Sequence, residues 1–453
     1  MMTISNNLKA GSLANIWMVL LLLSFSYDKA LIQITPYDRF NPRLFDIATI
    51  LGIIWYLNLK HFKLYPNKVF TSYKKIILWF AVCVILGLFL YPFPMHVNLY
   101  SLYFLLRYFQ ELLVLYFVLI FISKYEINYD SLFKILILGG VFVSIYCFIE
   151  YQNPVEEVFK LANGDTLIKP PGFIWGPFTA SYFQIANYSP IIGLLTVSYA
   201  LKQQVNKQWF YLLISLFVLW PSLYSGSRTG VGFVFIMFLI AAILEVRYRK
   251  IFIVVLLLVI VFFIFNYSRL NYLLIHSDNE TIQRTIELQA GSGHDSISTR
   301  FQAFFTWFKI IPSYIYSGIF LPFIGAGFYV APIDGYFRIG YGWHNIFIFV
   351  IEQAGVVGLW LFFKFLFKTY KVLKKAYNQL SKQSAEYWFK FTVYIIFLSI
   401  ILTGVSGAHV FWRGFATGNF NSFRLIILLI AAQPKSSYSR FLRLNYEKNI
   451  VDK

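Results

Sequence analysis

A polar segment, residues 268–342, separates two hydrophobic stretches and ends at Trp343-His344-Asn345, where the second stretch begins. The imidazole of His344 can take a proton from an attacking hydroxyl, because histidine titrates near neutral pH. Guanidinium groups hold phosphate or carboxylate through two parallel hydrogen bonds. The segment carries four of these groups, on Arg269, Arg284, Arg300 and Arg338. This combination at a membrane surface indicates a site for a phosphorylated lipid substrate.

A second polar motif, Ser225-Gly226-Ser227-Arg228-Thr229-Gly230, precedes another hydrophobic stretch. A helix that begins here directs its unpaired N–H groups and the positive end of its dipole toward the polar surface. With the hydroxyl of Ser227 and the guanidinium of Arg228, such a helix start is suited to bind an anion. The alternative is an ordinary helix cap with an arginine at the membrane surface.

Two further motifs lie inside the polar segment. Residues 296–311 begin with polar side chains and continue with dense aromatic ones, which predicts an amphipathic helix at the membrane interface. Arg300 would lie in its first turn and face a lipid headgroup, although plain anchoring is the alternative. Gly325-Ala326-Gly327 predicts a turn in which another backbone segment can approach closely.

Small residues follow His344 along the predicted helix. At about 100° per residue, Gly355 falls roughly 20° around the helix from His344, and Gly358 roughly 40° to the other side. This stripe predicts close packing of a neighbouring helix, with His344 above it at the polar end. Asn345 would orient the imidazole or end the loop, and a capping role for His344 is the alternative.

The composition determines which elements must position these residues. Hydrophobic residues form 58% of the chain, charged residues 13%, and the mean hydropathy is +0.63, whereas soluble domains are about a quarter charged. We therefore predict an all-α integral membrane protein, in which residues 1–453 form a single polytopic domain. Hydrophobic stretches long enough to cross a bilayer predict about twelve spans, near 13–27, 44–59, 76–91, 99–123, 132–151, 176–200, 208–223, 229–246, 251–267, 343–366, 387–408 and 420–433.

The distribution of charge predicts the orientation. With both termini cytoplasmic, the whole net charge of +19 falls on the cytoplasmic segments, as the preference of Lys and Arg for that side requires. Residues 268–342 then form a large periplasmic loop between spans 9 and 10. The charge has this topogenic cause and attracts anionic membrane lipids, so no nucleic-acid partner is expected. Most basic residues on the periplasmic side are arginines, which suits phosphate or carboxylate recognition.

Several classes of site are not expected. Cys83 and Cys147 lie inside predicted spans and are interpreted as core residues. The histidines form no HExxH motif, so no metal is expected. No phosphate-binding GxxxxGK[ST] loop is present either, and no cofactor is expected.

Taken in order, these motifs resemble those of the O-antigen ligase and O-antigen polymerase superfamily of bacterial membrane glycosyltransferases. The resemblance covers residues 225–360, and His344-Asn345 followed by Gly355 and Gly358 is its most specific part. One departure is Phe304, where ligases more usually have leucine. The resemblance implies a GT-C-like helical fold in the bacterial inner membrane, with a metal-independent active site on the periplasmic side. It implies a glycan on undecaprenyl diphosphate as the donor.

The resemblance also implies roles for individual residues. Arg228 and Arg300 would bind the diphosphate, and His344 would act as the general base in an inverting transfer. Supporting residues would be Ser227, Asn345, Gly355, Gly358 and Arg338. In a ligase the acceptor is lipid A–core, and in a polymerase it is another lipid-linked repeat unit; both remain open.

Two other classes remain as alternatives. A lipid-glycan flippase or other transporter could use buried charges such as Arg107 and Glu111. A metal-dependent GT-C transferase could use Asp28 or Asp38 in the first periplasmic loop.

Overall fold

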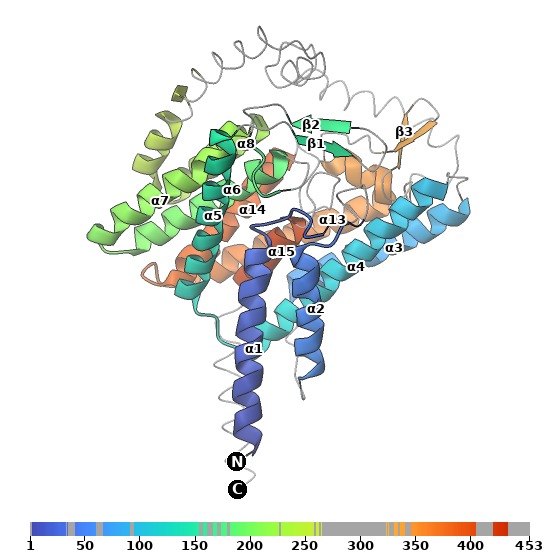
Figure 1. The fold of residues 1–453 in the computed structure, drawn as a ribbon, viewed down its shortest axis with the longest axis horizontal. Coiled ribbons are helices and arrows are strands. Elements are labelled where there is room, and N and C mark those ends of the chain that lie inside the picture. Colours follow the sequence, from blue (N-terminus) through green and yellow to red (C-terminus); the bar gives the residue numbers. More distant parts are fainter. Residues whose placement is uncertain are drawn as a thin grey trace.

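The computed structural model describes the greater part of the chain. The described residues are 2–32, 34, 41–59, 67–90, 95–153, 157–160, 166–169, 174–178, 182–225, 228–257, 260–261, 264, 323, 325, 330–333, 336–339, 346–404 and 420–433. They form a bundle of helices with two short β-hairpins at one end (Figure 1). The helices are α1 (Met2–Ser24), α2 (Leu44–Leu57), α3 (Lys68–Leu90), α4 (Met95–Lys124), α5 (Tyr129–Gln152), α6 (Tyr182–Lys202), α7 (Val205–Tyr224), α8 (Arg228–Leu244), α13 (Ile346–Asn378), α14 (Ala385–Gly404) and α15 (Phe420–Ala431).

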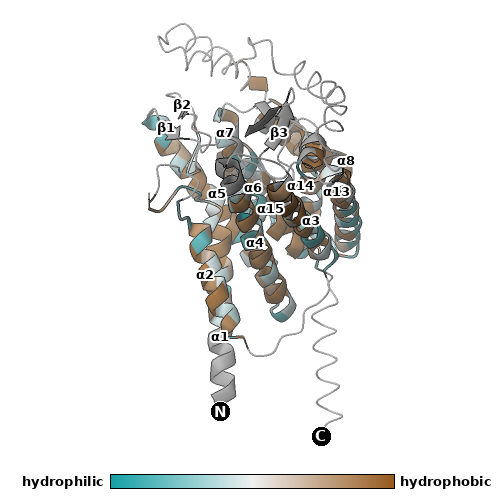
Figure 2. Ribbon diagram, turned by 90° about the vertical axis from the view of Figure 1, so that its right-hand side faces the viewer, coloured by the Kyte–Doolittle hydropathy of each residue, from teal (hydrophilic) through white to brown (hydrophobic). Residues whose placement is uncertain are grey.

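Four of these helices contain segments long and apolar enough to cross a membrane. The segments are Lys68–Phe89, Leu102–Lys124, Tyr129–Gln152 and Ala385–Gly404. Shorter apolar helices are present as well, and many hydrophilic residues lie near helix ends (Figure 2). The described residues are thus consistent with a helical membrane protein, and the four segments coincide with four of the predicted spans.

The two hairpins are additions that the all-α prediction missed. Strands β1 (Glu157–Lys160) and β2 (Thr166–Lys169) pair antiparallel, as do β3 (Val330–Ile333) and β4 (Tyr336–Ile339). The sequences between the paired strands contain Asn-Gly and Asp-Gly, which are the dipeptides typical of tight hairpin turns. Both hairpins lie at the end of the bundle opposite the start of α1 (Figure 1). We call this the outer end, and the other the inner end.

Some helix boundaries differ from the prediction for local reasons. Helix α3 begins at Lys68 rather than near residue 76, because Asn67 caps it: its Oδ1 accepts hydrogen bonds from the N–H groups of Val69 and Phe70, at 2.9 and 3.1 Å. Residues 176–178 fall within the predicted span 176–200 but belong to a buried, non-helical segment before α6. Helix α13 continues to Asn378, because its lysine-rich part still has good helix formers.

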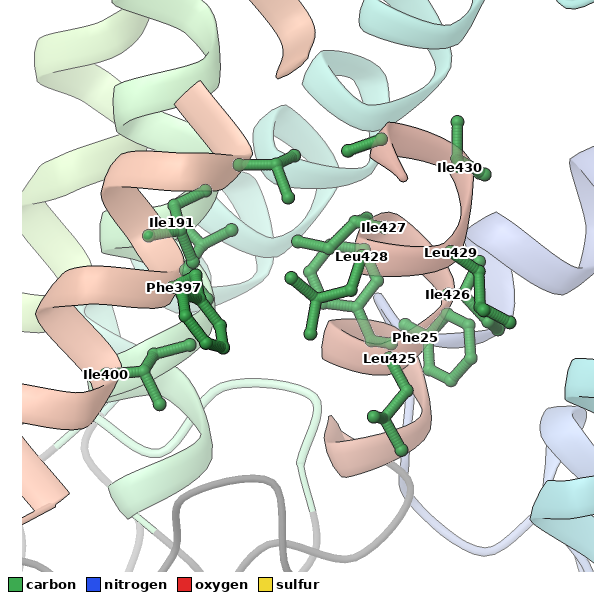
Figure 3. Close-up of a cluster of buried hydrophobic side chains, with 14 of the residues drawn as sticks. Phe25, Ile191, Phe397, Ile400, Leu425, Ile426, Ile427, Leu428, Leu429 and Ile430 are labelled. Carbon is green, nitrogen blue, oxygen red and sulfur yellow. The ribbon is translucent and has the colours of Figure 1, made fainter. Parts of the chain in front are cut away.

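The core surrounds the short helix α15. Its residues Leu425–Ile430 are buried, and the ring of Phe423 lies 5.4 Å from that of Phe25 at the end of α1 (Figure 3). A helical segment that is apolar on all sides, as residues 425–430 are, must be covered on all sides, and α15 contacts α3, α4, α13 and α14. Cys83 and Cys147 are buried among the hydrophobic side chains, which confirms their interpretation as core residues.

Ion pairs and hydrogen bonds close the inner end. Lys202 at the end of α6 pairs with Asp130 at the start of α5. Lys382, in the turn after α13, lies 2.6 Å from Glu245 at the end of α8. These contacts join segments that the charge distribution predicts on one side of the membrane.

Candidate functional site

Helix α13 is broken at Gly355, eleven residues after His344 in the sequence. Gly355 has φ 64° and ψ −170°, a conformation that only glycine adopts readily. The break changes the hydrogen bonding on either side, because carbonyls before it lose their helical donors. The carbonyl of Ala354 accepts a hydrogen bond from Nε1 of Trp79 in α3, at 2.9 Å. The break is therefore a braced feature of the helix.

Gly325 packs directly against this break. Its φ is +69°, and a Cβ atom there would lie 2.4 Å from both the nitrogen of Ala354 and the carbonyl carbon of Gln353. No side chain fits at that distance, so the close backbone approach predicted for this turn is confirmed at Gly325. Gly325 is thereby held on the first part of α13.

The predicted glycine stripe needs a correction. The prediction assumed one continuous helix from His344 to Gly358, but the conformation of Gly355 changes the direction and register of the residues that follow. Gly358 still lies against a neighbouring helix, since a Cβ atom there would be 3.5 Å from Cδ1 of Trp79. It would also be 2.2 Å from Cβ of Ala354, across the break.

The start of α8 is held close to α6. Helix α8 begins at Arg228, within the motif 225–230 and one residue before the predicted span 229–246. A Cβ atom at Gly230 would lie 2.6 Å from Cβ of Ala186 and 3.1 Å from its carbonyl oxygen. That carbonyl has no donor four residues later in α6, because residue 190 is proline. At the end of α7, the hydroxyl of Ser225 donates a hydrogen bond to the carbonyl of Ser222, at 2.8 Å.

Three buried polar residues meet at the same end of α6, on the face opposite this contact, and we call them the outer polar cluster: Asp28, Arg43 and Gln184. Oδ2 of Asp28 lies 2.8 Å from Nη1 of Arg43 and accepts a hydrogen bond from Nε2 of Gln184 at 3.1 Å. All three residues are less than 6% exposed. Asp28 was proposed as a metal ligand in one alternative, but it forms an ion pair with Arg43.

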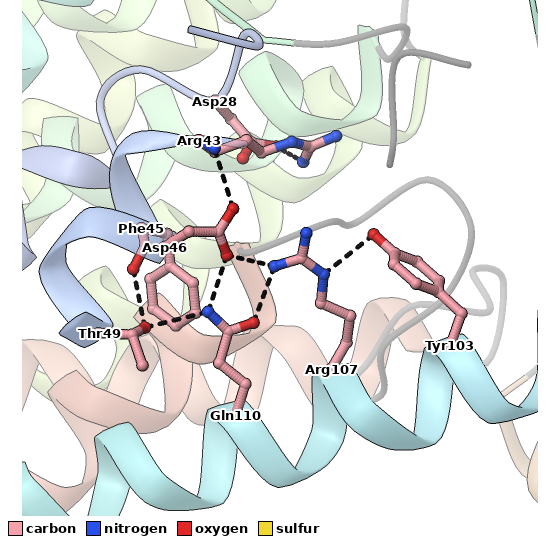
Figure 4. A network of polar contacts seen from close by, with 8 residues as sticks. All are labelled: Asp28, Arg43, Phe45, Asp46, Thr49, Tyr103, Arg107 and Gln110. Carbon is pink, nitrogen blue, oxygen red and sulfur yellow. Dashed lines mark hydrogen bonds and ion pairs between the residues drawn. The ribbon is translucent and has the colours of Figure 1, made fainter. Parts of the chain in front are cut away.

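A second network extends from Arg43 along α2 and α4 (Figure 4). The backbone N–H of Arg43 donates to Oδ2 of Asp46 at 2.9 Å, and the other carboxylate oxygen pairs with Arg107. Gln110 donates to Asp46 at 2.8 Å, and Nε of Arg107 donates to the hydroxyl of Tyr103 at 2.9 Å. The donors surrounding this carboxylate account for its burial in an apolar helix.

Glu111, one residue further along α4, is fully buried in a separate cluster. Its carboxylate accepts hydrogen bonds from the hydroxyls of Tyr73 and Ser422 and from Nδ2 of Asn421. The sequence marked Arg107 and Glu111 as buried charges, which are functional-site candidates in a membrane. It did not reveal that they belong to different clusters, and it missed Gln184 and Asn421.

The structure describes only part of the predicted site. Backbones of Arg228 and Arg338 lie in α8 and β4, while their side chains are outside the described part of the chain. The same holds for the residues Ser227, Arg300, His344 and Asn345, and for Asp38 of the metal-dependent alternative. Within the described residues, no group of three His, Cys, Asp or Glu side chains lies together as a metal site.

The starts of α8 and α13 nevertheless lie at the same end of the bundle. Lys382 follows α13 and pairs with Glu245 after α8, so both helices end at the inner end. Both therefore begin at the outer end, where the hairpin β3–β4 also lies (Figure 1). The first residues of α8 and of α13 thus lie at one end of the bundle.

Comparison with known proteins adds no family assignment. The chain matches no protein-family model, and no curated protein is detectably similar to it. The resemblance to the O-antigen ligase and polymerase superfamily therefore rests on the motif residues themselves.

Proposed function

We propose that this protein is a bacterial inner-membrane glycosyltransferase that acts on the periplasmic side. It moves a glycan from undecaprenyl diphosphate to a sugar hydroxyl of lipid A–core, as an O-antigen ligase does. The fold proposed with this function is GT-C-like, with about twelve spans and both termini in the cytoplasm. Neither a metal nor another cofactor takes part.

The observation that supports this proposal most is the braced break in α13. The helix begins two residues after His344 in the sequence, and Gly325 and Trp79 hold its first part in place. In membrane helices, such breaks occur where the backbone is buried in protein or lines a polar cavity. A rigid first segment beside the polar segment 268–342 is what a histidine base needs for a fixed position.

The proposed reaction assigns one task to each motif. His344 accepts the proton of the acceptor hydroxyl, whose oxygen forms a bond to the anomeric carbon. The bond from that carbon to the diphosphate oxygen breaks, and the leaving diphosphate takes the electron pair. Arg228 and Arg300 stabilise its negative charge. Attack from the opposite face inverts the anomeric configuration.

The acceptor distinguishes the ligase from a repeat-unit polymerase, since the donor chemistry is shared. Deletion in the native bacterium separates them. Lipid A–core without any O-chain supports the ligase, whereas core that carries a single repeat supports the polymerase. A normal O-chain in the deletion strain contradicts both.

The catalytic assignment is tested with His344→Ala. A general base typically contributes about 10²–10⁴-fold to the rate, so the purified variant should bind the lipid-linked donor but lose turnover by about that factor. Arg228→Lys and Arg300→Lys should also lose most activity, because a lysine cannot make the bidentate phosphate contact. The controls are His276→Ala and His294→Ala, which should behave as wild type. Near-normal turnover of His344→Ala, at matched protein concentration, would refute its role as a base.

A further inference from the structure

We infer that the outer polar cluster, Asp28, Arg43 and Gln184, is a subsite that binds a hydroxyl group of a saccharide. This inference rests on the proposed function, because it assigns the cluster to the glycan rather than to the diphosphate. None of the motifs that predicted the active site includes these three residues. They come from three different elements: the loop after α1, the residue before α2, and the first turn of α6.

Two polar atoms of this cluster have unused hydrogen-bonding capacity. Within the described structure, Nε of Arg43 and Oε1 of Gln184 are both buried and have no hydrogen-bond partner. Their residues are only 5% and 3% exposed. Buried polar atoms are nearly always paired, because leaving one unpaired is unfavourable. Two such atoms in one cluster point to a ligand.

The identity of the two atoms restricts the ligand. Arg43 Nε–H needs an acceptor, and Gln184 Oε1 needs a donor. Nη1 of Arg43 and Nε2 of Gln184 bind the same oxygen of Asp28. The guanidinium and the amide that carry the two unpaired atoms are therefore neighbours. A phosphate oxygen could only accept, and it would face the carboxylate of Asp28. An ammonium could only donate, and it would face the guanidinium of Arg43. A hydroxyl group does both.

The position of the cluster identifies that hydroxyl as part of a sugar. Gln184 precedes Ala186 by two residues in α6, and Ala186 contacts Gly230, in the first turn of α8. An α-helix rises about 1.5 Å and turns about 100° per residue, so the cluster lies at nearly the height of the start of α8 along α6, on the opposite face of that helix. A glycan that extends from a diphosphate held at that start, across the outer end of α6, would bring its sugars near the cluster. The acceptor glycan would have the same hydroxyl chemistry.

Two substitutions test the subsite while keeping its surroundings. Arg43→Lys preserves the charge opposite Asp28 but removes the Nε–H donor. Gln184→Met preserves the size of the side chain but removes the amide. Ser189→Ala is the control, because Ser189 Oγ is also buried on α6 without a partner in the described structure, but it is not part of the cluster.

The first measurement needs no turnover. Glycan released from the lipid-linked donor by mild acid should raise the unfolding temperature of the wild-type protein and of Ser189→Ala, because a ligand stabilises the state that binds it. Arg43→Lys and Gln184→Met should bind it about 10–100-fold more weakly. If one variant does not fold, the other decides. No stabilisation of wild type, or equal stabilisation of all variants, overturns the subsite and leaves water as the occupant.

Kinetics then identify the source of the hydroxyl. A rise in KM for the donor alone assigns the subsite to the transferred glycan, and a rise in KM for the acceptor alone assigns it to the acceptor. Both outcomes support the subsite, while unchanged KM values for both substrates overturn it. The proposed function fails separately if wild-type protein binds the glycan but transfers none.

Discussion

The two ends of the helix bundle solve the problem of polar groups in a membrane protein differently. At the inner end, charged groups pair with one another, as Lys382 does with Glu245. The hydroxyl of Ser198 bonds with those of Tyr248 and Thr392, and burial raises the pKa of Tyr248, so that it stays protonated. Single unpaired atoms occur there too, as on the indole of Trp388, whereas at the outer end two unpaired atoms, on Arg43 and Gln184, belong to one cluster. The comparison indicates that the inner end serves stability and the outer end serves binding.

The backbones of the two ends differ in the same way. The outer end depends on glycines where no side chain fits, at Gly230 and Gly325, and on the helix break at Gly355. Such conformations are unfavourable for other residues and persist where the surrounding structure requires them. Substitutions at the outer end should therefore affect both stability and transfer. Comparable substitutions at the inner end should affect stability alone, and weakly.

The largest effect is expected for Gly325→Ala. A Cβ atom would lie 2.4 Å from the backbone at Ala354, and the positive φ adds backbone strain of about 1–3 kcal/mol. Overpacking adds about 1–3 kcal/mol, so unfolding of the purified protein in detergent should become easier by roughly 2–6 kcal/mol. Glycan transfer should be almost lost. Unchanged transfer would show that the contact between Gly325 and α13 has no part in the site.

Asp28→Ala should have the next largest effect on stability. It leaves the guanidinium of Arg43 buried without its counter-ion, and removing one partner of a buried pair typically costs about 3–5 kcal/mol. Asp28→Asn keeps an acceptor for both neighbours and should lose less. Equal losses in the two variants would show that the charge of Asp28, rather than its hydrogen bonds, holds the cluster together.

A matched pair of glycines in α8 gives a smaller and more specific contrast. Gly230→Ala places a Cβ atom 2.6 Å from Ala186, which should cost about 1–3 kcal/mol and move the helix start that carries Arg228. Gly232→Ala meets no atom within 4 Å and should stabilise the helix by about 0.5–1 kcal/mol. Transfer should fall only in the first variant. A similar loss in both would mean that α8 responds to any change in its first turns.

Local sequence predicted the features that depend on local physics. Hydrophobic stretches of sufficient length indicated the helical membrane class, and a polar motif before such a stretch indicated the start of α8 at Arg228. The turn at Gly325 followed from the tolerance of glycine for positive φ. The hairpins were also predictable, because Asn163-Gly164 and Asp334-Gly335 are strong turn signals.

Contacts between distant segments could not be predicted in the same way. Asp28 and Gln184 are separated by 156 residues, and Glu111 and Asn421 by 310. Hydrophobic pattern does not indicate which helices are neighbours. The break at Gly355 could not be predicted either, because a glycine is compatible with both a continuous and a broken helix. Contacts from the distant residues Gly325 and Trp79 accompany the broken helix.

The smallest effect is expected at the inner end, for Lys382→Ala. The side chain of Lys382 is 59% exposed, so water and salt screen its attraction to Glu245, and exposed ion pairs contribute only about 0–1 kcal/mol. The variant should unfold in detergent almost like wild type and should transfer glycan at the wild-type rate. The loss should shrink further at high salt. Glu245→Ala removes the other partner of the same ion pair. Glu245 is nearly buried, and its loss leaves the exposed amino group of Lys382 free to reach water. A clear loss of transfer in either variant, with protein stability unchanged, would break the division between the two ends, because it would connect the inner ion pair to the outer site.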